Sequence, residues 1–139
     1  MADASYPTVV QTVLDTTDPR TLAEFYRELL GLHYRPGDEP PAPGDPDPNG
    51  QDWLVLTGAV PLAFQYVPEL PAATWPDPRV PQQLHLDITV PSTEELDRHG
   101  QRAIDLGARL LFDRSDDPQE PLRVFADPAG HPFCLFVGS

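Results

Sequence analysis

His85 and Asp87 are the side chains of this sequence best suited to chemistry, and they lie two positions apart in LHLDITV (84–90). Alternate residues of a β-strand face the same side, so the pair points to one face if this segment is a strand. An imidazole can bind a metal, act as a general base or form a structural hydrogen bond. Asp87 can orient His85 or bind a cationic group, and a solvated aspartate is an equal alternative.

Three more polar or soft residues occupy comparable strand-like segments. Gln11 lies in TVVQTVLDT (8–16), Gln65 in VPLAFQYVP (60–68) and Cys134 in HPFCLFVG (131–138). A cysteine thiolate can bind zinc or a softer metal. Cys134 also fits a simpler role as a small buried residue on a core strand.

Aromatic side chains common in the walls of small-molecule sites complete the candidate set. They are Trp53, Tyr66, Trp75 and Phe136, and core packing explains Tyr66 and Phe136 equally well. Trp75 lies in a proline-rich loop, so we expect it to cover either a ligand or a second subunit. His131, after Gly130, is expected to serve a turn or its packing rather than catalysis.

The elements that must position these residues occur twice. In the first half, a helix is predicted over 18–31, with Asp18 as N-cap, Pro19 at the first helical position and Gly31 after the end. In the second half, Ser92 and Glu95 form a capping-box pattern at the start of a helix over 91–107. Predicted strands cover 8–16, 32–36, 51–58 and 60–68, then 82–90, 108–114, 121–127 and 131–138.

Both halves therefore have the order βαβββ, which indicates an internal duplication. Gln11 and His85 are 74 positions apart, and Gly31 and Gly107 are 76 apart. We expect one domain over 1–139, with module 1 at about 6–68 and module 2 at about 82–138. A proline-rich linker, PELPAATWPDPRVP (68–81), joins them, because proline interrupts helices and central strands.

The sequence resembles the vicinal oxygen chelate superfamily, which includes glyoxalase I, extradiol dioxygenases and bleomycin-resistance proteins. The likeness rests on DPRTLAEFYRELLG (18–31), on LHLDITV (84–90) and on DPAGHPFCLF (127–136), in that order and spacing. It implies an α+β fold in which two βαβββ modules form a curved, partly open, eight-stranded barrel-like sheet with helices outside. It also implies a homodimer, in which Gln11 and Gln65 of one chain meet His85 and Cys134 of the other.

The resemblance places the family's metal ligands at Gln11, Gln65, His85 and Cys134, where metal-binding members usually have His, Glu, His and Glu. Only His85 keeps the pattern. A glutamine oxygen is neutral and a weak ligand for zinc, nickel, cobalt or iron, so we expect the metal to be absent or weakly bound. Gln65 also lacks the titratable group that a general base needs.

Amino-acid composition limits the classes of partner that this protein is expected to bind. A net charge of −13 opposes binding to nucleic acid, and it suits a cationic ligand as well as simple solubility. The single cysteine, the lack of a secretory leader and the lack of a long apolar run predict a soluble cytoplasmic protein without a membrane span. Residues 36–50, PGDEPPAPGDPDPNG, favour disorder or a mobile lid.

Three functions remain open. The first is a glyoxalase-like protein that binds a small organic molecule without a tightly held metal, as the bleomycin-resistance branch does by sequestration. The second is a metal-dependent lyase, isomerase or dioxygenase with an atypical Gln, His and Cys site. The third is metal-independent acid–base catalysis by His85 with Asp87.

Overall fold

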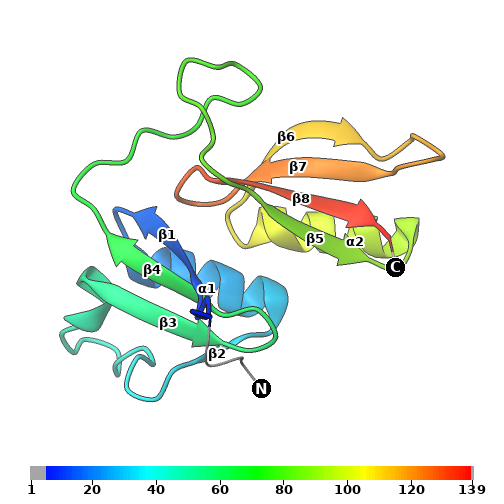
Figure 1. Ribbon diagram of the computed structural model, residues 1–139. Coiled ribbons are helices and arrows are strands. Elements are labelled where there is room, and N and C mark those ends of the chain that lie inside the picture. The colour runs from blue at the N-terminus through cyan, green and yellow to red at the C-terminus, as the bar shows by residue number, and fades with distance from the viewer. Residues whose placement is uncertain (1–5, 139) are drawn as a thin grey trace.

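The chain folds into two βαβββ modules in the computed structural model, which describes residues 6–138 (Figure 1). The elements of module 1 are β1 (Thr12–Thr16), α1 (Pro19–Leu30), β2 (His33–Tyr34), a short 3-10 helix (Asn49–Gln51), β3 (Trp53–Thr57) and β4 (Leu62–Tyr66). Those of module 2 are β5 (Leu86–Val90), α2 (Thr93–Asp105), β6 (Arg109–Arg114), β7 (Leu122–Ala126) and β8 (Pro132–Val137). The predicted succession of elements is confirmed.

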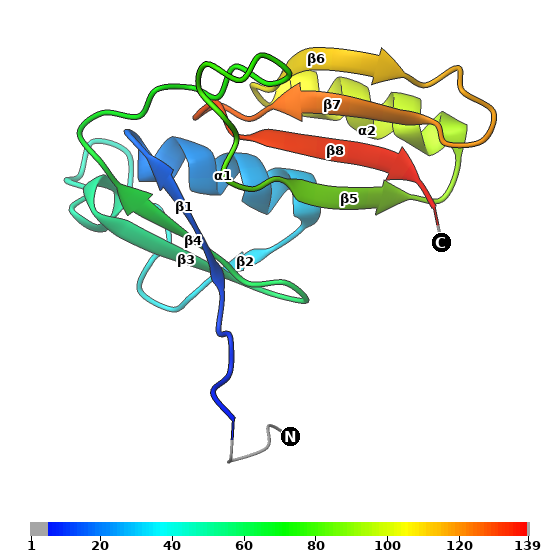
Figure 2. The same cartoon turned by 45° about the horizontal axis from the view of Figure 1, so that its top comes forward.

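Each module contains one mixed four-stranded sheet, and the two sheets have matching topologies. Their orders are β1-β4-β3-β2 and β5-β8-β7-β6, with the first and last strands of each module parallel and the other pairs antiparallel. Figure 2 shows that the sheets remain open rather than closing into a barrel. The predicted α+β fold with paired modules is therefore confirmed, and its strands form two separate sheets.

The helices begin where the sequence predicts. The Asp18 side chain accepts a hydrogen bond from the Thr21 amide, and Gly31 ends α1 in a left-handed conformation with φ of 67°. Ser92 accepts from the Glu95 amide at the start of α2. Neither of these helices is long and apolar enough to cross a membrane, and none elsewhere in residues 6–138 is.

The core is shared by the two modules. Tyr26 of α1 stacks on Phe64 of module 1, and Tyr26 and Phe25 both pack on Phe133 of module 2, with ring centroids 5.7 Å apart for Phe25 and Phe133. Leu86 and Ile88 of β5 pack against the same core, as their alternation predicts. Alternation along 82–90 also predicts Leu84 on that face, but Leu84 precedes the strand and is 40% exposed. Helix α1 therefore packs against the core side of both sheets, and the opposite side of each sheet stays open.

The proline-rich segment 36–50 is anchored to module 1. Asp38 is buried, and its carboxylate accepts a hydrogen bond of 2.9 Å from the Val55 amide at the edge of β3. Arg20 of α1 binds the Asp47 carboxylate and the Asp38 carbonyl, at 2.8 and 2.7 Å. These contacts hold the segment against α1 and β3, although its composition favours disorder.

Candidate functional site

The open face of the second sheet forms one wall of a cavity of about 420 Å³, which we call the Trp75 cavity. The linker segment around Trp75 covers it. Most of its lining is apolar, and the few polar groups converge on one space. The lining residues are Trp75, Gln82, His85, Asp87, Phe112, Arg114, Glu120, Leu122, Val124, Pro132, Cys134 and Phe136.

The pairing of β5 with β8 determines which side chains reach this cavity. Asp87 lies opposite Cys134 in the parallel ladder, so these side chains share a face. Phe133 and Leu135 alternate with Cys134, and both are buried in the core on the other face. The face predicted for His85 and Asp87 is the one that lines the cavity.

A β-bulge in β6 turns Phe112 into the same cavity. Leu110 pairs with Phe125, whose side chain is in the core, whereas Phe112 pairs with Val124, which lines the cavity. The register shifts between Leu110 and Phe112. Leu110 and Phe112 are two positions apart and would share a face in a regular strand. The extra residue of the bulge puts them on opposite faces instead.

Trp75 meets this displaced ring. The indole lies edge-on to Phe112, with ring centroids 6.3 Å apart and an interplanar angle of 86°. This T-shaped geometry is favourable for aromatic pairs. Trp75 is partly buried, and it covers the cavity from the linker side.

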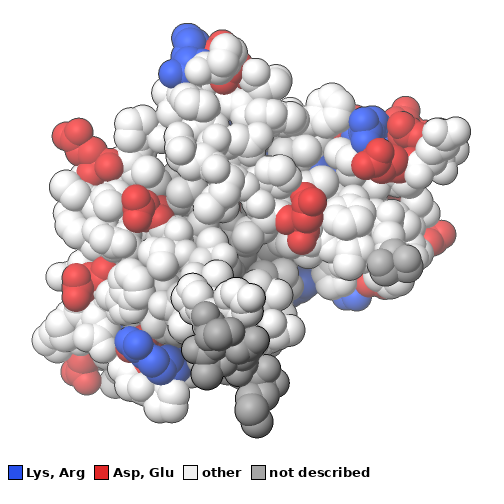
Figure 3. Space-filling model, in the orientation of Figure 1, with Lys and Arg blue, Asp and Glu red and all other residues white. Residues whose placement is uncertain are grey.

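The polar groups give the cavity an acidic balance. His85 Nε2 lies 3.1 Å from the Asp87 carboxylate, and both side chains are about half exposed or more. Arg114 Nη2 lies 3.3 Å from Glu120. Asp87 and Glu120 against Arg114 leave the acidic and basic side chains of the lining with an excess of one negative charge. Figure 3 shows acidic side chains spread over this side of the molecule, with no gathered basic patch.

Cys134 is nearly buried at the base of the cavity. Burial, with a smaller contribution from the Asp87 charge, raises the pKa of its thiol to about 11. The thiol is therefore protonated near neutral pH. A protonated thiol is a poor nucleophile and a poor metal ligand.

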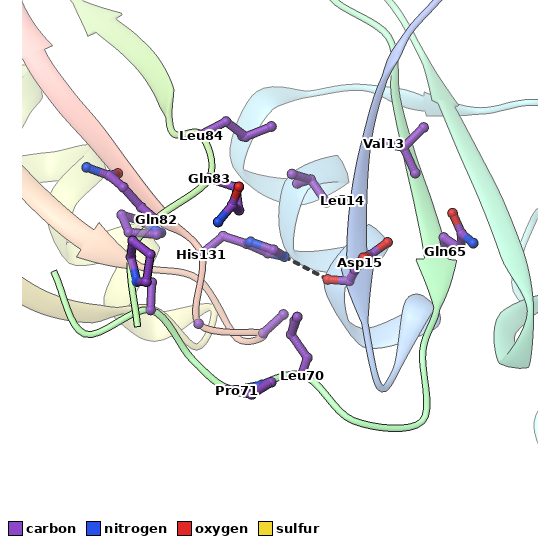
Figure 4. A pocket seen from close by; sticks show the side chains of 15 residues that line it. Val13, Leu14, Asp15, Gln65, Leu70, Pro71, Gln82, Gln83, Leu84 and His131 are labelled. Carbon is purple, nitrogen blue, oxygen red and sulfur yellow. Dashed lines mark hydrogen bonds between the residues drawn. The ribbon is translucent and has the colours of Figure 1, made fainter. Parts of the chain in front are cut away.

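A second hollow of about 270 Å³, the junction cavity, lies between the modules. Figure 4 shows Val13, Asp15 and Gln65 of module 1 across from Gln82, Gln83 and His131, with the linker residues Leu70 and Pro71 along one border. His131 Nε2 lies 2.7 Å from the Asp15 carbonyl oxygen and so joins the modules. Gln82 and Pro132 line both cavities, which are therefore adjacent.

The predicted site residues do not all meet. Trp75, His85, Asp87, Cys134 and Phe136 line the Trp75 cavity, whereas Gln65 lines the junction cavity. Gln11, Trp53 and Tyr66 line neither; Trp53 pairs with Gln65 between β3 and β4, and Tyr66 is 45% exposed.

Sequence reasoning missed several lining residues. Phe112 depends on the bulge, and Arg114 and Glu120 lie at the two ends of an acidic hairpin whose composition is typical of a solvated connection. Asp15 lies four residues after Gln11 and Gln83 lies two before His85, so strand periodicity puts each on the same face as its candidate and could have identified both.

The family's metal ligand positions do not form a site within one chain. Gln65 lies in a different cavity from His85 and Cys134, and Gln11 lines neither. Between residues 6 and 138, no three His, Cys, Asp or Glu side chains are grouped so as to hold an ion. A set of two neutral amides, one imidazole and one protonated thiol does not fit a divalent cation.

Comparison with solved structures shows the same fold in other proteins. A glyoxalase/bleomycin resistance protein/dioxygenase family enzyme from Burkholderia phytofirmans PsJN is 16% identical, with 91% of this chain and 95% of that chain covered and a TM-score of 0.66. The fosfomycin resistance protein FosX from Mesorhizobium loti is 12% identical, with 96% and 94% covered and a TM-score of 0.66.

A lactoylglutathione lyase from Agrobacterium tumefaciens is 20% identical, with 95% of each chain covered and a TM-score of 0.58. At these identities the likeness establishes the fold alone. A comparison with curated proteins found no match. The model of the glyoxalase-like domain matches residues 11–136, which is nearly the whole chain. With its two βαβββ modules, the chain therefore belongs to the glyoxalase-like domain family.

Proposed function

We propose that this protein binds a small organic molecule in the Trp75 cavity without a tightly held divalent metal. The observation that carries the proposal is the cavity itself, an apolar space of about 420 Å³ into which a few polar groups converge. Its volume lies within the roughly 300–1,000 Å³ of typical small-molecule sites. Aromatic walls from Trp75, Phe112 and Phe136 suit a flat or apolar ligand body.

The charge of the lining favours a cationic ligand. Asp87 and Glu120 outnumber Arg114, and Arg114 is already paired with Glu120. Asp87 is the carboxylate left to meet a positive group, and its other neighbour is the imidazole of His85. A ligand with an aromatic or aliphatic body and one amine therefore complements both the walls and the charge.

A ligand screen tests this proposal. Aromatic amines and matched carboxylic acids of the same ring systems are titrated by calorimetry into the wild type and into Asp87→Asn. We expect the amines to bind and the acids not to bind, with about tenfold or greater loss of amine affinity in Asp87→Asn. Trp75→Ala should weaken binding through lost contact area.

Asp45→Asn is the matched control, because it makes the same charge change at an exposed residue of the 36–50 segment that does not line the cavity. Binding that is insensitive to Asp87, His85 and Trp75 alike would contradict the proposal. So would a preference for the carboxylic acids.

The homodimer belongs to the same proposal. Val9, Val10 and Val13 of module 1 and Phe112 of module 2 are apolar and exposed, and contact with a second copy of the chain would bury them. In the proposed dimer, Gln11 and Gln65 of one chain face His85 and Cys134 of the other and complete the cleft. Light scattering coupled to size exclusion measures the mass, and a strictly monomeric protein would contradict the shared cleft.

A second candidate function is metal-independent acid–base catalysis. The distance of 3.1 Å between His85 Nε2 and the Asp87 carboxylate supports it, because such a carboxylate orients an imidazole for proton transfer. A pH–rate profile that changes in both His85→Gln and Asp87→Asn is expected for any substrate found. An unchanged profile in either variant would exclude this pair as the catalytic unit.

A further inference from the structure

We infer that the junction cavity is a second binding site, for a small molecule carrying an amidinium or guanidinium group, with the Asp15 carboxylate as its counter-ion. This site is separate from the proposed ligand position under Trp75. It draws on module 1, the linker and the turn before β8. Its volume of about 270 Å³ is just below that of sites for drug-sized ligands, so we expect an occupant of about one ring.

The polar lining contains hydrogen-bond acceptors on opposite walls. Asp15 and Gln65 are partners in the parallel β1–β4 ladder, so their side chains lie next to one another on the same face. Gln82, Gln83 and His131 lie across from them (Figure 4). A ligand that meets both walls must therefore donate hydrogen bonds in more than one direction.

The contact between His131 and Asp15 defines which ring nitrogen of His131 carries the hydrogen. A carbonyl oxygen can only accept, so the contact with Asp15 requires the hydrogen on Nε2 of His131. In the neutral ring, Nδ1 then carries a lone pair. His131 lines the cavity, and this nitrogen is available to a donor on a ligand.

The polar side-chain groups of Asp15 and of the three lining glutamines have no hydrogen-bond partners among the described residues. Within residues 6–138, the Asp15 carboxylate forms no ion pair or hydrogen bond, and the amides of Gln65, Gln82 and Gln83 form no hydrogen bonds. The lining has no Lys or Arg. The uncompensated carboxylate therefore selects a cation and disfavours an anion.

The shape of the donor set favours a planar cation over an ammonium group. An amidinium or guanidinium presents several N–H groups in one plane, and two of them match the two oxygens of a carboxylate. Its remaining N–H groups can reach the His131 lone pair and a glutamine oxygen on the other wall. Val13, Leu14, Leu70 and Leu84 supply apolar contacts for an attached ring.

Three isosteric probes test the inference: benzamidine, benzamide and benzoate, titrated into ¹⁵N-labelled protein. The side-chain amide signals of Gln65 and Gln83 are the readout. Gln83 decides between the two cavities, because it lines the junction cavity and not the Trp75 cavity, whereas Gln65 also faces His85 of the partner subunit in the proposed dimer. We expect these signals to shift with benzamidine, more weakly with benzamide and not with benzoate. Equal shifts with benzoate, or none with benzamidine, would overturn the inference.

Two substitutions test the location of the site by changing the benzamidine affinity in opposite directions. Asp15→Asn is expected to lower the benzamidine affinity reported by these signals about tenfold or more, because it removes the counter-ion. Gln83→Glu is expected to raise the benzamidine affinity reported by the remaining Gln65 signal, because it adds a carboxylate to the opposite wall. A gain of affinity requires a folded variant, so unchanged or weaker binding in Gln83→Glu would count against the site.

The same titration separates this inference from the proposed function. In Asp87→Asn, the Gln83 response should persist, because Asp87 lines only the Trp75 cavity. Loss of this response in Asp87→Asn but not in Asp15→Asn would assign the binding to the Trp75 cavity and overturn the inference. The Asp45→Asn variant again controls for charge.

Discussion

The Tyr26 hydroxyl of module 1 donates a hydrogen bond of 2.7 Å to Oδ2 of Asp127 in module 2, and both residues are buried. The other carboxylate oxygen accepts from the amides of Ala129 and His131. The same turn carries the His131 ring to the Asp15 carbonyl. The Asp127 turn therefore joins the modules and shapes one end of the junction cavity.

Replacing the hydroxyl should weaken this junction. Tyr26→Phe removes the donor and keeps the ring, so the buried carboxylate loses one of its hydrogen bonds. A hydrogen bond to a charged group contributes about 1.5–3 kcal/mol, and we expect a loss of that order in the free energy of unfolding. Urea denaturation followed by circular dichroism measures it.

Tyr66→Phe is the matched control, because it deletes the same hydroxyl from a residue that is 45% exposed. We expect its free energy of unfolding to stay within about 0.5 kcal/mol of the wild type. If both variants lost equal stability, the Tyr26–Asp127 hydrogen bond would not be the cause.

The Asp127 carboxyl should also give stability a specific pH dependence. Burial raises its pKa above the ordinary value of 3.8, with the Tyr26 hydrogen bond opposing the shift. Between the ordinary and the raised value, the folded state holds a proton that the unfolded state has released. The contribution of Asp127 to stability is therefore largest below pH 3.8 and falls as the pH rises through the raised value.

Asp127→Asn isolates this contribution. The asparagine oxygen can still accept from the Ala129 and His131 amides, and the side chain no longer titrates. The free energy of unfolding of the wild type minus that of Asp127→Asn should decrease as the pH rises above 3.8, and then level off. Urea titrations from acidic to neutral pH measure the difference, and a rise over this range would contradict the assigned shift.

Asp38 should anchor the 36–50 segment. Its buried carboxylate accepts from the Val55 amide and pairs with Arg35 at 3.0 Å. Asp38→Ala leaves the amide without its partner, so we expect a loss of about 1–3 kcal/mol in the free energy of unfolding and faster proteolysis within 36–50. Asp45→Ala in the same segment is exposed and should change neither measurement.

The sequence predicted the elements well because the signals are local. Asp18, Pro19 and Gly31 mark the ends of α1, and alternation placed His85 and Asp87 on one face.

Phe112 shows where local signals are not enough. Regular alternation puts it on the same face as Leu110, and only the bulge separates the two residues. Gln65 and Cys134 occupy corresponding strands, but the docking of the modules through α1 assigns them to different cavities. Asp38 similarly orders a segment whose composition favours disorder.

Metal binding is the property on which this chain should differ most from the family's usual pattern. The four ligand positions are divided among two cavities and a residue outside both, and the pKa of the Cys134 thiol is raised to about 11. We therefore expect chelator-treated protein to show no stoichiometric binding of zinc, nickel, cobalt or ferrous ions by calorimetry near neutral pH. Elemental analysis of untagged protein should agree. Stoichiometric binding that disappears in His85→Ala would show that Gln11 and Gln65 of one chain complete a site with His85 and Cys134 of the other, because one chain alone does not bring the two glutamines to His85. That result would favour a metal-dependent lyase, isomerase or dioxygenase over metal-free ligand binding.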